Sequence, residues 1–333
     1  MKPNWAASCS SSQASSPAWV SRAAKSRSSK RKASVALDEA ADDPNPADRT
    51  WSSLPSLRRM LKGLPCWWLA IVCTAAATVG PSAPLLHGLE VFSGEGHLSA
   101  ACKKIVGPWS TFERNDNDSE DIMREEGVLI LLGRLLRVRR GGIVWLGTPC
   151  QSWIALSRSF SMRTSLSPQG PIDALCTPKQ LSYLKEHNAM GYISSLILRT
   201  AFMLGIHFCL EKPVSSLLFK FAPMKDALQE TGAASYHFHM ESLNGESPKP
   251  LRVLGTAPCL KTFIEVTQIR QKLCKKPAAQ RLVKRDAAGG YTGVAKHLKQ
   301  SSAYTPCMGV AFALAFKGLS AASIVECLTS KGF

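Results

Sequence analysis

Apolar residues along this chain fall into short runs typical of buried strands and longer stretches with helical periodicity. Helices are expected near residues 97–106, 123–138, 179–204 and 308–316, and the apolar stretch 191–204 should belong to the core. Strands are expected near residues 88–92, 109–113, 143–147, 206–211, 235–240 and 251–255. Alternation of this kind predicts an α/β fold, with a doubly wound, mainly parallel sheet and helices on both faces.

Composition divides the 333 residues into four parts. Residues 1–60 are rich in Ser, Ala, Lys and Arg, and bury too little apolar surface to offset the entropy of ordering, so a disordered tail is expected. An apolar segment at 61–84 precedes one α/β domain at 85–320, and residues 321–333 form a C-terminal tail or the end of a helix. The basic cluster at 25–32 is typical of a nuclear address, which predicts a nuclear protein.

Residues 64–79 form an apolar run that leaves two interpretations open. The run follows Arg58, Arg59 and Lys62, an arrangement that resembles a signal anchor. It is shorter than the roughly 20 apolar residues of a membrane span, and it contains two threonines and a proline. A helix that packs on the domain is therefore favoured over membrane contact, and a membrane-anchored or organelle-targeted protein through 58–80 is the alternative.

Cysteine and histidine spacing gives no sign of a metal site. The eleven cysteines are scattered and form no C-x-x-C pair, which favours a reducing compartment and argues against structural zinc. His237 and His239 alternate along an expected strand, as the pleat requires. No metal is expected.

Residues 147–152 place a cysteine on a proline-stiffened turn directly after the apolar run 143–146. An open α/β sheet presents reactive groups at such strand ends. Pro149 restricts the backbone, so the turn can hold the Cys150 thiol at the rim of a cleft with little freedom left to lose. The alternative is a cysteine that serves only as a small apolar side chain.

Residues 89–101 are typical of a strand, a G-x-G turn and the start of a helix. Gly94 and Gly96 would let the backbone approach a ligand closely, and the helix start offers unpaired N–H groups. The next strand ends in Glu113, where a carboxylate usually binds the ribose of a nucleoside. The segment predicts a nucleoside-bearing cofactor, with a plain tight turn as the alternative.

Together these two motifs resemble the DNA (cytosine-5) methyltransferase family. Residues 92–96 match its F-x-G-x-G element, and Gly147, Pro149, Cys150 and Gln151 match its G-x-P-C-Q-x-x-S loop, whose final serine is replaced by Ile154. The resemblance covers roughly residues 85–318 and implies a Rossmann-like methyltransferase fold that binds S-adenosyl-L-methionine. The implied cofactor contacts are Phe92, Ser93, Gly94, Gly96, Leu98, Glu113 at the ribose, Asp121 at the adenine amino group, and Pro149.

Downstream, the resemblance continues with departures. Glu211 matches the glutamate of the family's E-N-V triplet, but Lys212 and Pro213 replace its other two residues. Arg252 matches an arginine of the Q-x-R-x-R strand, and residues 268–272 are an alternative match. Residues 304–313 are similar to the closing G-N-x-V segment without its asparagine.

The resemblance implies catalysis by Cys150, Glu211 and Arg252. Cytosine C5 is a poor nucleophile, so a Cys150 thiolate would first add to C6. A nearby cation would favour the thiolate, and Arg158 and Arg252 are the candidates. Glu211 would donate a hydrogen bond or proton at N3, and the target base would have to leave the duplex.

The charge balance suits a nucleic-acid partner. Lys and Arg number 41 against 24 Asp and Glu, a formal charge of +17. Residues 268–300 are expected to form a basic loop that touches phosphate, with a solvated surface loop as the alternative. The expected nucleic-acid contacts are Gln151, Lys275, Lys276, Arg281, Lys284 and Arg285.

The sequence thus predicts a divergent cytosine-5 methyltransferase that acts on nucleic acid, DNA rather than RNA. An RNA-directed relative is one alternative. A catalytically inactive protein that binds cofactor and nucleic acid is another, suggested by Lys212 and Pro213. A dinucleotide-dependent oxidoreductase is the third, and it would leave Cys150 without a role.

Overall fold

The computed structural model describes residues 64–80, 83–171, 176–246, 249–273, 283–285, 291–293 and 303–333. The expected tail at 1–60 lies outside these residues. Six strands form the central sheet in the order β2-β1-β3-β4-β6-β5. Their bounds are β1 Leu86–Val91, β2 Trp109–Phe112, β3 Val138–Leu146, β4 His207–Pro213, β5 Ala234–His239 and β6 Pro250–Gly255.

The sheet is mixed but mostly parallel. β1 pairs in parallel with β2 and β3, and β3 pairs in parallel with β4, whereas β6 is antiparallel to both β4 and β5. Within this sheet β6 alone therefore runs opposite to the other five strands. Helices α3 (His97–Ile105), α4 (Glu125–Leu136) and α6 (Pro178–Met203) make the crossovers between the first four strands, which is what parallel pairing requires. A short link through the 3-10 turn η7 (Met240–Leu243) joins β5 to β6 and permits their antiparallel pairing.

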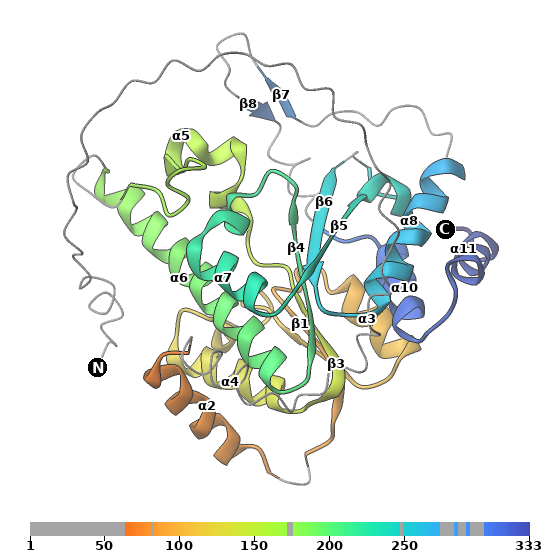
Figure 1. The fold of residues 1–333 in the computed structure, drawn as a ribbon, viewed down its shortest axis with the longest axis horizontal. Coiled ribbons are helices and arrows are strands. Elements are labelled where there is room, and N and C mark those ends of the chain that lie inside the picture. The colour runs from red at the N-terminus through yellow and green to blue at the C-terminus, as the bar shows by residue number, and fades with distance from the viewer. Residues whose placement is uncertain are drawn as a thin grey trace, which may run out of the picture. The chain divides into compact units, whose positions relative to one another are not determined.

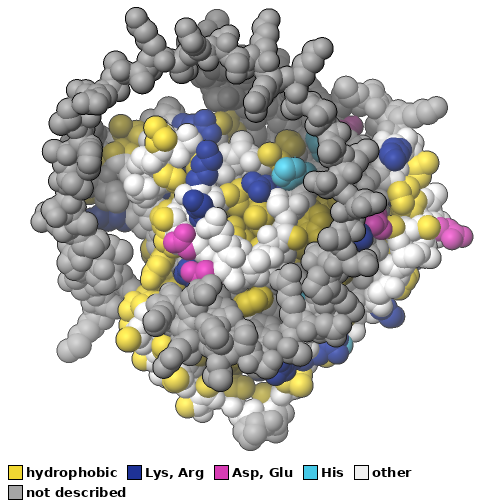
Figure 2. Space-filling view, in the orientation of Figure 1, with side chains coloured by type: hydrophobic (Ala, Val, Ile, Leu, Met, Phe, Trp, Pro, Cys, Tyr) yellow, Lys and Arg dark blue, Asp and Glu magenta, His cyan; other side chains and the backbone are white. Residues whose placement is uncertain are grey.

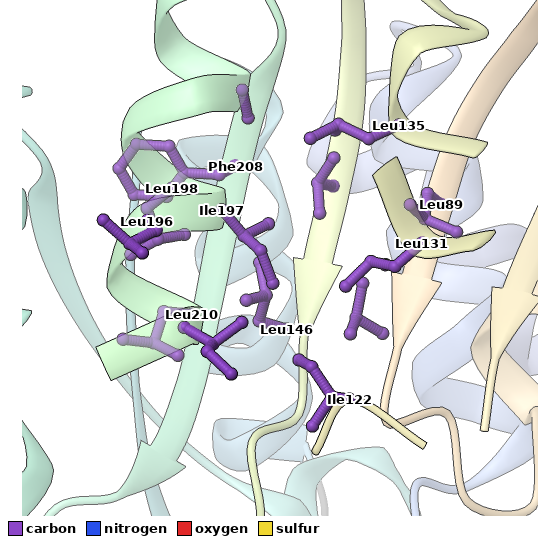
Figure 3. Close-up of a cluster of buried hydrophobic side chains, with 14 of the residues drawn as sticks. Leu89, Ile122, Leu131, Leu135, Leu146, Leu196, Ile197, Leu198, Phe208 and Leu210 are labelled. Carbon is purple, nitrogen blue, oxygen red and sulfur yellow. The ribbon is translucent and has the colours of Figure 1, made fainter. Parts of the chain in front are cut away.

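Helices cover both faces of the sheet (Figure 1). One core cluster joins the sheet to α2 (Cys66–Thr78), α4, α6 and α7 (Ala222–Glu230). In Figure 3, Leu146 and Phe208 from the strands meet Leu131 from α4 and Ile197 from α6 in this cluster. The second cluster joins the opposite face to α3, α8 (Cys259–Leu273), α10 (Pro306–Phe316) and α11 (Ala321–Ser330). The stretch 191–204 is largely buried in the first cluster, as predicted.

The apolar run near the N-terminal end of the described region is a helix that packs on the domain. Trp68 of α2 is fully buried, and its Nε1 donates a 2.9 Å hydrogen bond to Thr200 Oγ1 on α6. α2 also packs against α4. None of the helices among the described residues combines the length and the apolar character that a membrane crossing requires.

Several boundaries differ from the sequence prediction. β3 begins at Val138 rather than near 143, because residues 139–142 are two arginines and two glycines without an apolar pattern, and the pairing with β1 is irregular there. α7 and α8 were not predicted. The basic loop expected from residue 268 is wrong at its start, since α8 continues to Leu273 and buries Arg270. The buried guanidinium of Arg270 is satisfied in part by the hydrogen bond that it donates to the Ser242 carbonyl oxygen at 2.8 Å.

The C-terminal region after α8 contains a small strand pair and a last helix. β7 (Val283–Arg285) and β8 (Tyr291–Gly293) form a separate antiparallel pair, which contains Lys284 and Arg285. Lys275, Lys276 and Arg281 lie outside the described residues. Residues 321–330, expected as a tail or a helix end, form α11, which packs on α8 and α10 through buried Ile324 and Leu328. Burial of these two side chains makes this segment part of the core.

Candidate functional site

The predicted motifs lie at one edge of the sheet, where the parallel strands end. Phe92 follows β1, Glu113 follows β2 and Gly147 follows β3, while Glu211 lies near the end of β4. The chain leaves β1 to form β2 on one side and then crosses back over β1 to form β3 on the other. In open α/β sheets such a reversal opens a crevice at the carboxyl ends of the two strands. The glycine loop and the cysteine loop therefore lie on either side of the position where such a crevice is expected.

The glycine loop, residues 92–96, has an unusual backbone. Phe92, Gly94 and Gly96 have φ values of 61°, 55° and 66°. A side chain in this left-handed region costs about 1 kcal/mol, so Phe92 is held in a strained conformation. A Cβ added at Gly94 or Gly96 would meet no atom within 4 Å. The loop backbone thus faces open space, which fits close approach of a ligand.

Glu113 ties the end of β2 to the glycine loop. Its carboxylate accepts hydrogen bonds from the Gly94 N–H at 2.9 Å and the Asn115 N–H at 3.1 Å. Its own N–H donates to Glu120 Oε2 at 2.8 Å, and Glu120 in turn is ion-paired with Arg134. The Glu113 carboxylate, which is at the predicted ribose position, is therefore held in place by hydrogen bonds from Gly94 of the glycine loop and from Asn115.

Asp121 is already engaged by its own surroundings. Its Oδ1 accepts from the Met123 N–H at 2.9 Å, and its Oδ2 lies 3.8 Å from Arg114 Nη1. Leu98 is fully buried in the core of the α3 face, so its side chain packs on the protein rather than lining the crevice. Among the expected cofactor residues, Gly94 and Gly96 border open space, and Glu113 is bonded to the Gly94 N–H.

Glu90 is a buried acid that sequence reasoning missed. It lies on β1, and its Oε2 accepts hydrogen bonds from the N–H and the hydroxyl of Ser99 at the start of α3. Burial raises the pKa of Glu90 to about 7. Glu90 Oε1 and Ser93 Oγ are buried and have no partner within the described region. The sequence signal that could have identified Glu90 is a single acidic residue inside an otherwise mostly apolar strand.

The buried polar atoms beside the glycine loop have the chemistry that S-adenosylmethionine would need. Unpartnered buried polar atoms need a donor or an acceptor from elsewhere, and Glu90 and Ser93 supply two beside the glycine loop. The open backbone of residues 94–96 and the Glu113 carboxylate add the features that a nucleoside requires. The residues present are compatible with this cofactor.

The cysteine loop packs against the glycine loop. The Gly147 N–H donates to the Val91 carbonyl oxygen at 3.0 Å, and a Cβ at Gly147 would lie 3.0 Å from the Phe92 carbonyl oxygen. Cys150 is half-buried and precedes the 3-10 turn η4 (Gln151–Trp153), whose Trp153 N–H donates to the Cys150 carbonyl oxygen at 2.9 Å. Pro149 is half-buried and Gln151 is exposed. The thiol is thus accessible and held by a short ordered turn.

Glu211 belongs to a buried hydrogen-bonded chain that sequence reasoning missed. The Tyr304 hydroxyl donates to Glu211 Oε2 at 2.9 Å and accepts from Trp145 Nε1 at 3.0 Å. Burial raises the pKa of Tyr304 well above its usual value, so Tyr304 remains a proton donor. Glu211 is 5% exposed, and its Oε1 has no partner among the residues described. A Cβ at Gly147 would lie 3.1 Å from the Tyr304 hydroxyl oxygen, which places this chain beside the cysteine loop.

Lys212 is a buried cation that contacts the cysteine loop, and the sequence did not predict this role. Lys212 is 2% exposed, and its Nζ donates to the carbonyl oxygen of Thr148. Burial lowers the pKa of Lys212, whereas the charges of Glu211 and Cys150 act to raise it. The Lys212 ammonium group is therefore within electrostatic range of both predicted catalytic groups.

The two arginines predicted to favour the thiolate point elsewhere. Arg158 is exposed at the start of the short helix α5 (Arg158–Ser161). Arg252 Nε donates to Ser235 Oγ at 2.8 Å, and its guanidinium carbon lies 5.0 Å from the centre of the Phe219 ring. Arg252 thereby borders a groove of about 260 Å³ beside α7 rather than contacting Cys150.

Arg163 is a second buried cation, and it contacts the 3-10 turn η4. Its guanidinium carbon lies 3.6 Å from the centre of the Trp153 ring, Nη2 donates to Ser152 Oγ at 3.2 Å, and Nη1 donates to Asn188 Oδ1 at 2.8 Å. Burial lowers the pKa of Arg163 to about 10. Since Ser152 and Trp153 follow Cys150 directly, Arg163 fastens the cysteine loop to α6.

The structure brings Cys150, Glu211 and the glycine loop to one edge; Arg252 lies opposite Lys212 in the pairing of β4 with β6, and its side chain bonds to Ser235. In the part of the chain that the structure describes, no three His, Cys, Asp or Glu side chains are grouped in a way that could hold a metal ion. No protein-family model matches the chain. A comparison with curated proteins likewise finds no significant match.

Proposed function

We propose that this protein transfers a methyl group from S-adenosylmethionine to C5 of cytosine in nucleic acid, DNA being favoured over RNA, and that its sheet is of the Rossmann-like methyltransferase type. One observation carries the proposal: Gly147 joins the cysteine loop to both Phe92 of the glycine loop and Tyr304, the hydrogen-bond partner of Glu211. A thiol, a carboxyl group and an open glycine loop therefore share one crevice. A nuclear location follows from a DNA substrate and belongs to the same proposal.

The glycine loop, Glu113 and the pair Glu90 and Ser93 would hold the cofactor. The open space beside Gly94 and Gly96 would receive the nucleoside, and Glu113 would bind its ribose hydroxyls. Bound there, S-adenosylmethionine supplies an electrophilic methyl group. Side chains of the protein would carry out the other steps of the reaction.

Cys150 and Glu211 divide the activation of the base. The Cys150 thiolate adds to C6 and forms a C–S bond, while the ring electrons move toward N3. Glu211, held by Tyr304, stabilises that charge by donating a hydrogen bond or a proton to N3 through its unpartnered Oε1. C5 is then nucleophilic enough to accept the methyl group. Loss of the C5 proton to a base and release of the Cys150 thiolate restore the aromatic ring.

The charge of the chain supports a nucleic-acid substrate. The chain carries a formal charge of +17, and Lys284 and Arg285 lie in β7, whose partner strand β8 lies beside the 3-10 turn η5 (Ala155–Ser157) after the cysteine loop. Lys and Arg side chains are spread among apolar and acidic ones on the described part of the face in Figure 2. A positive charge of this size suits contacts to phosphate.

Trapping with DNA that contains 5-fluorocytosine tests the proposal, because fluorine at C5 blocks the final elimination. We expect the full-length protein to form a covalent adduct that depends on S-adenosylmethionine. Cys150→Ala should abolish the adduct, whereas Cys327→Ala, a half-buried cysteine of α11, should not. The same assay with RNA separates the two substrates. Folded protein that forms no adduct with either nucleic acid would refute the proposal.

A further inference from the structure

Lys212 is buried in a place where the proposed reaction needs a positive charge. Lysine is almost never fully buried without a partner, because its ammonium group loses solvation. Here Nζ donates to the carbonyl oxygen of Thr148, two residues before Cys150. The Thr148 hydroxyl also lies 3.1 Å from Ser194 Oγ on α6. Both oxygens of Thr148 are therefore held, and the loop that carries Cys150 is clamped between β4 and α6.

The charges around Lys212 and Cys150 come from few elements. Lys212 interacts electrostatically with Glu211 on its own strand, with Cys150, and with Lys249, the last of which opposes its charge. Tyr183 of α6 also interacts electrostatically with Cys150; its pKa is raised mainly by burial, while Arg163 acts to lower it and the Cys150 charge acts to raise it. Arg163 is a second cation near Cys150, because it donates to Ser152 in the same loop. The charge interaction of Lys212 with Cys150 favours the charged form of both groups.

We propose that Lys212 is the residue that stabilises the Cys150 thiolate and fixes its loop, in the position where the resembling family has a neutral asparagine. The inference rests on the proposed function for its purpose. Its chemistry is independent, since a stabilised thiolate is more reactive at neutral pH toward any electrophile. In this view Lys212 acts through Cys150 and is a positioning residue; the departure from the family motif supports catalysis rather than abolishing it.

Alkylation of Cys150 by iodoacetamide measures the thiolate without cofactor or nucleic acid. Trypsin releases residues 141–158 as one peptide with Cys150 as its single cysteine, so mass spectrometry follows this thiol alone. We expect the pH midpoint of alkylation to rise by about one to two units in Lys212→Gln and in Lys212→Met. At a pH well below both midpoints, the rate should fall about tenfold for each unit of that rise.

Two variants serve as controls. Lys225→Gln removes an exposed lysine of α7 and should leave the midpoint unchanged. Arg252→Gln removes the arginine suggested by the family motif, and should also have little effect because its guanidinium is bound to Ser235. A midpoint that stays the same in a folded Lys212→Gln protein, or that moves equally with Arg252→Gln, would overturn the inference.

A reciprocal measurement covers the case in which both Lys212 variants fail to fold. If the ammonium group favours the thiolate, the thiolate must favour the ammonium group by the same factor. In protein with ¹³C-labelled lysine, Cys150→Ser should therefore lower the titration midpoint of one lysine signal by about one unit or more. Lysine signals that all titrate as in the wild type would refute the proposal. Adduct formation with 5-fluorocytosine is a separate readout, so failure of the proposed function would be distinguished from failure of this inference.

Discussion

Replacing Glu90 by glutamine should change how the stability of the protein depends on pH. Glu90 is buried on β1, away from water, and its carboxyl group is bonded only to Ser99 among the described residues. Glutamine keeps the shape and can still accept a hydrogen bond from Ser99. It removes only the ionisable group, so the comparison isolates the proton.

The size and sign of the effect follow from the pKa. Burial raises the pKa of Glu90 from an ordinary 4.5 to about 7. As the pH rises between these values, the unfolded chain loses the proton while the folded protein keeps it, so the free energy of unfolding falls. At 1.36 kcal/mol per unit, the contribution is fully present below about pH 4.5 and some 3 kcal/mol is lost by about pH 7.

Urea unfolding between pH 4.5 and 8 measures this contribution. The wild type should lose about 3 kcal/mol more over this range than Glu90→Gln. Glu120→Gln is the matched control: burial acts to raise the pKa of Glu120, but hydrogen bonds from Arg134 and from the Glu113 N–H together lower it. Its stabilisation is therefore present above its ordinary pKa and lost in acid, the opposite sign. Parallel curves for the wild type and Glu90→Gln would refute the reasoning.

Two further predictions concern the docking of α2 and the holding of Glu211. Trp68→Ala should lower the free energy of unfolding, measured in urea, by about 3–5 kcal/mol, because it removes a fully buried indole and its hydrogen bond to Thr200. Trp67 is half-buried, so Trp67→Ala should lower the free energy of unfolding by less. Equal losses in the two variants would contradict the packing of α2. Tyr304→Phe should slow 5-fluorocytosine adduct formation about tenfold while S-adenosylhomocysteine affinity, measured by calorimetry, stays within about twofold, because the hydroxyl serves Glu211. A loss of cofactor affinity instead would assign Tyr304 to the cofactor site.

The sequence by itself determined the α/β class and the location of the two loops. Strands and helices follow from the periodicity of apolar residues, which is a local property. A motif that directly follows a strand must lie at the carboxyl end of that strand, and parallel strands share that edge. The order of strands and motifs along the chain is therefore enough to expect residues 92–96 and the loop of Cys150 at one edge of the sheet.

Only the tertiary structure decided the direction of β6 and the partners of the buried polar groups. A strand has the same apolar pattern in either direction, so pairing with β4 and β5 sets its orientation. Lys212 meets Thr148 across 64 residues, and Tyr304 meets Glu211 across 93. Periodicity carries no information about such contacts, because they depend on which distant segments pack together and on the need to satisfy every buried charge and hydroxyl.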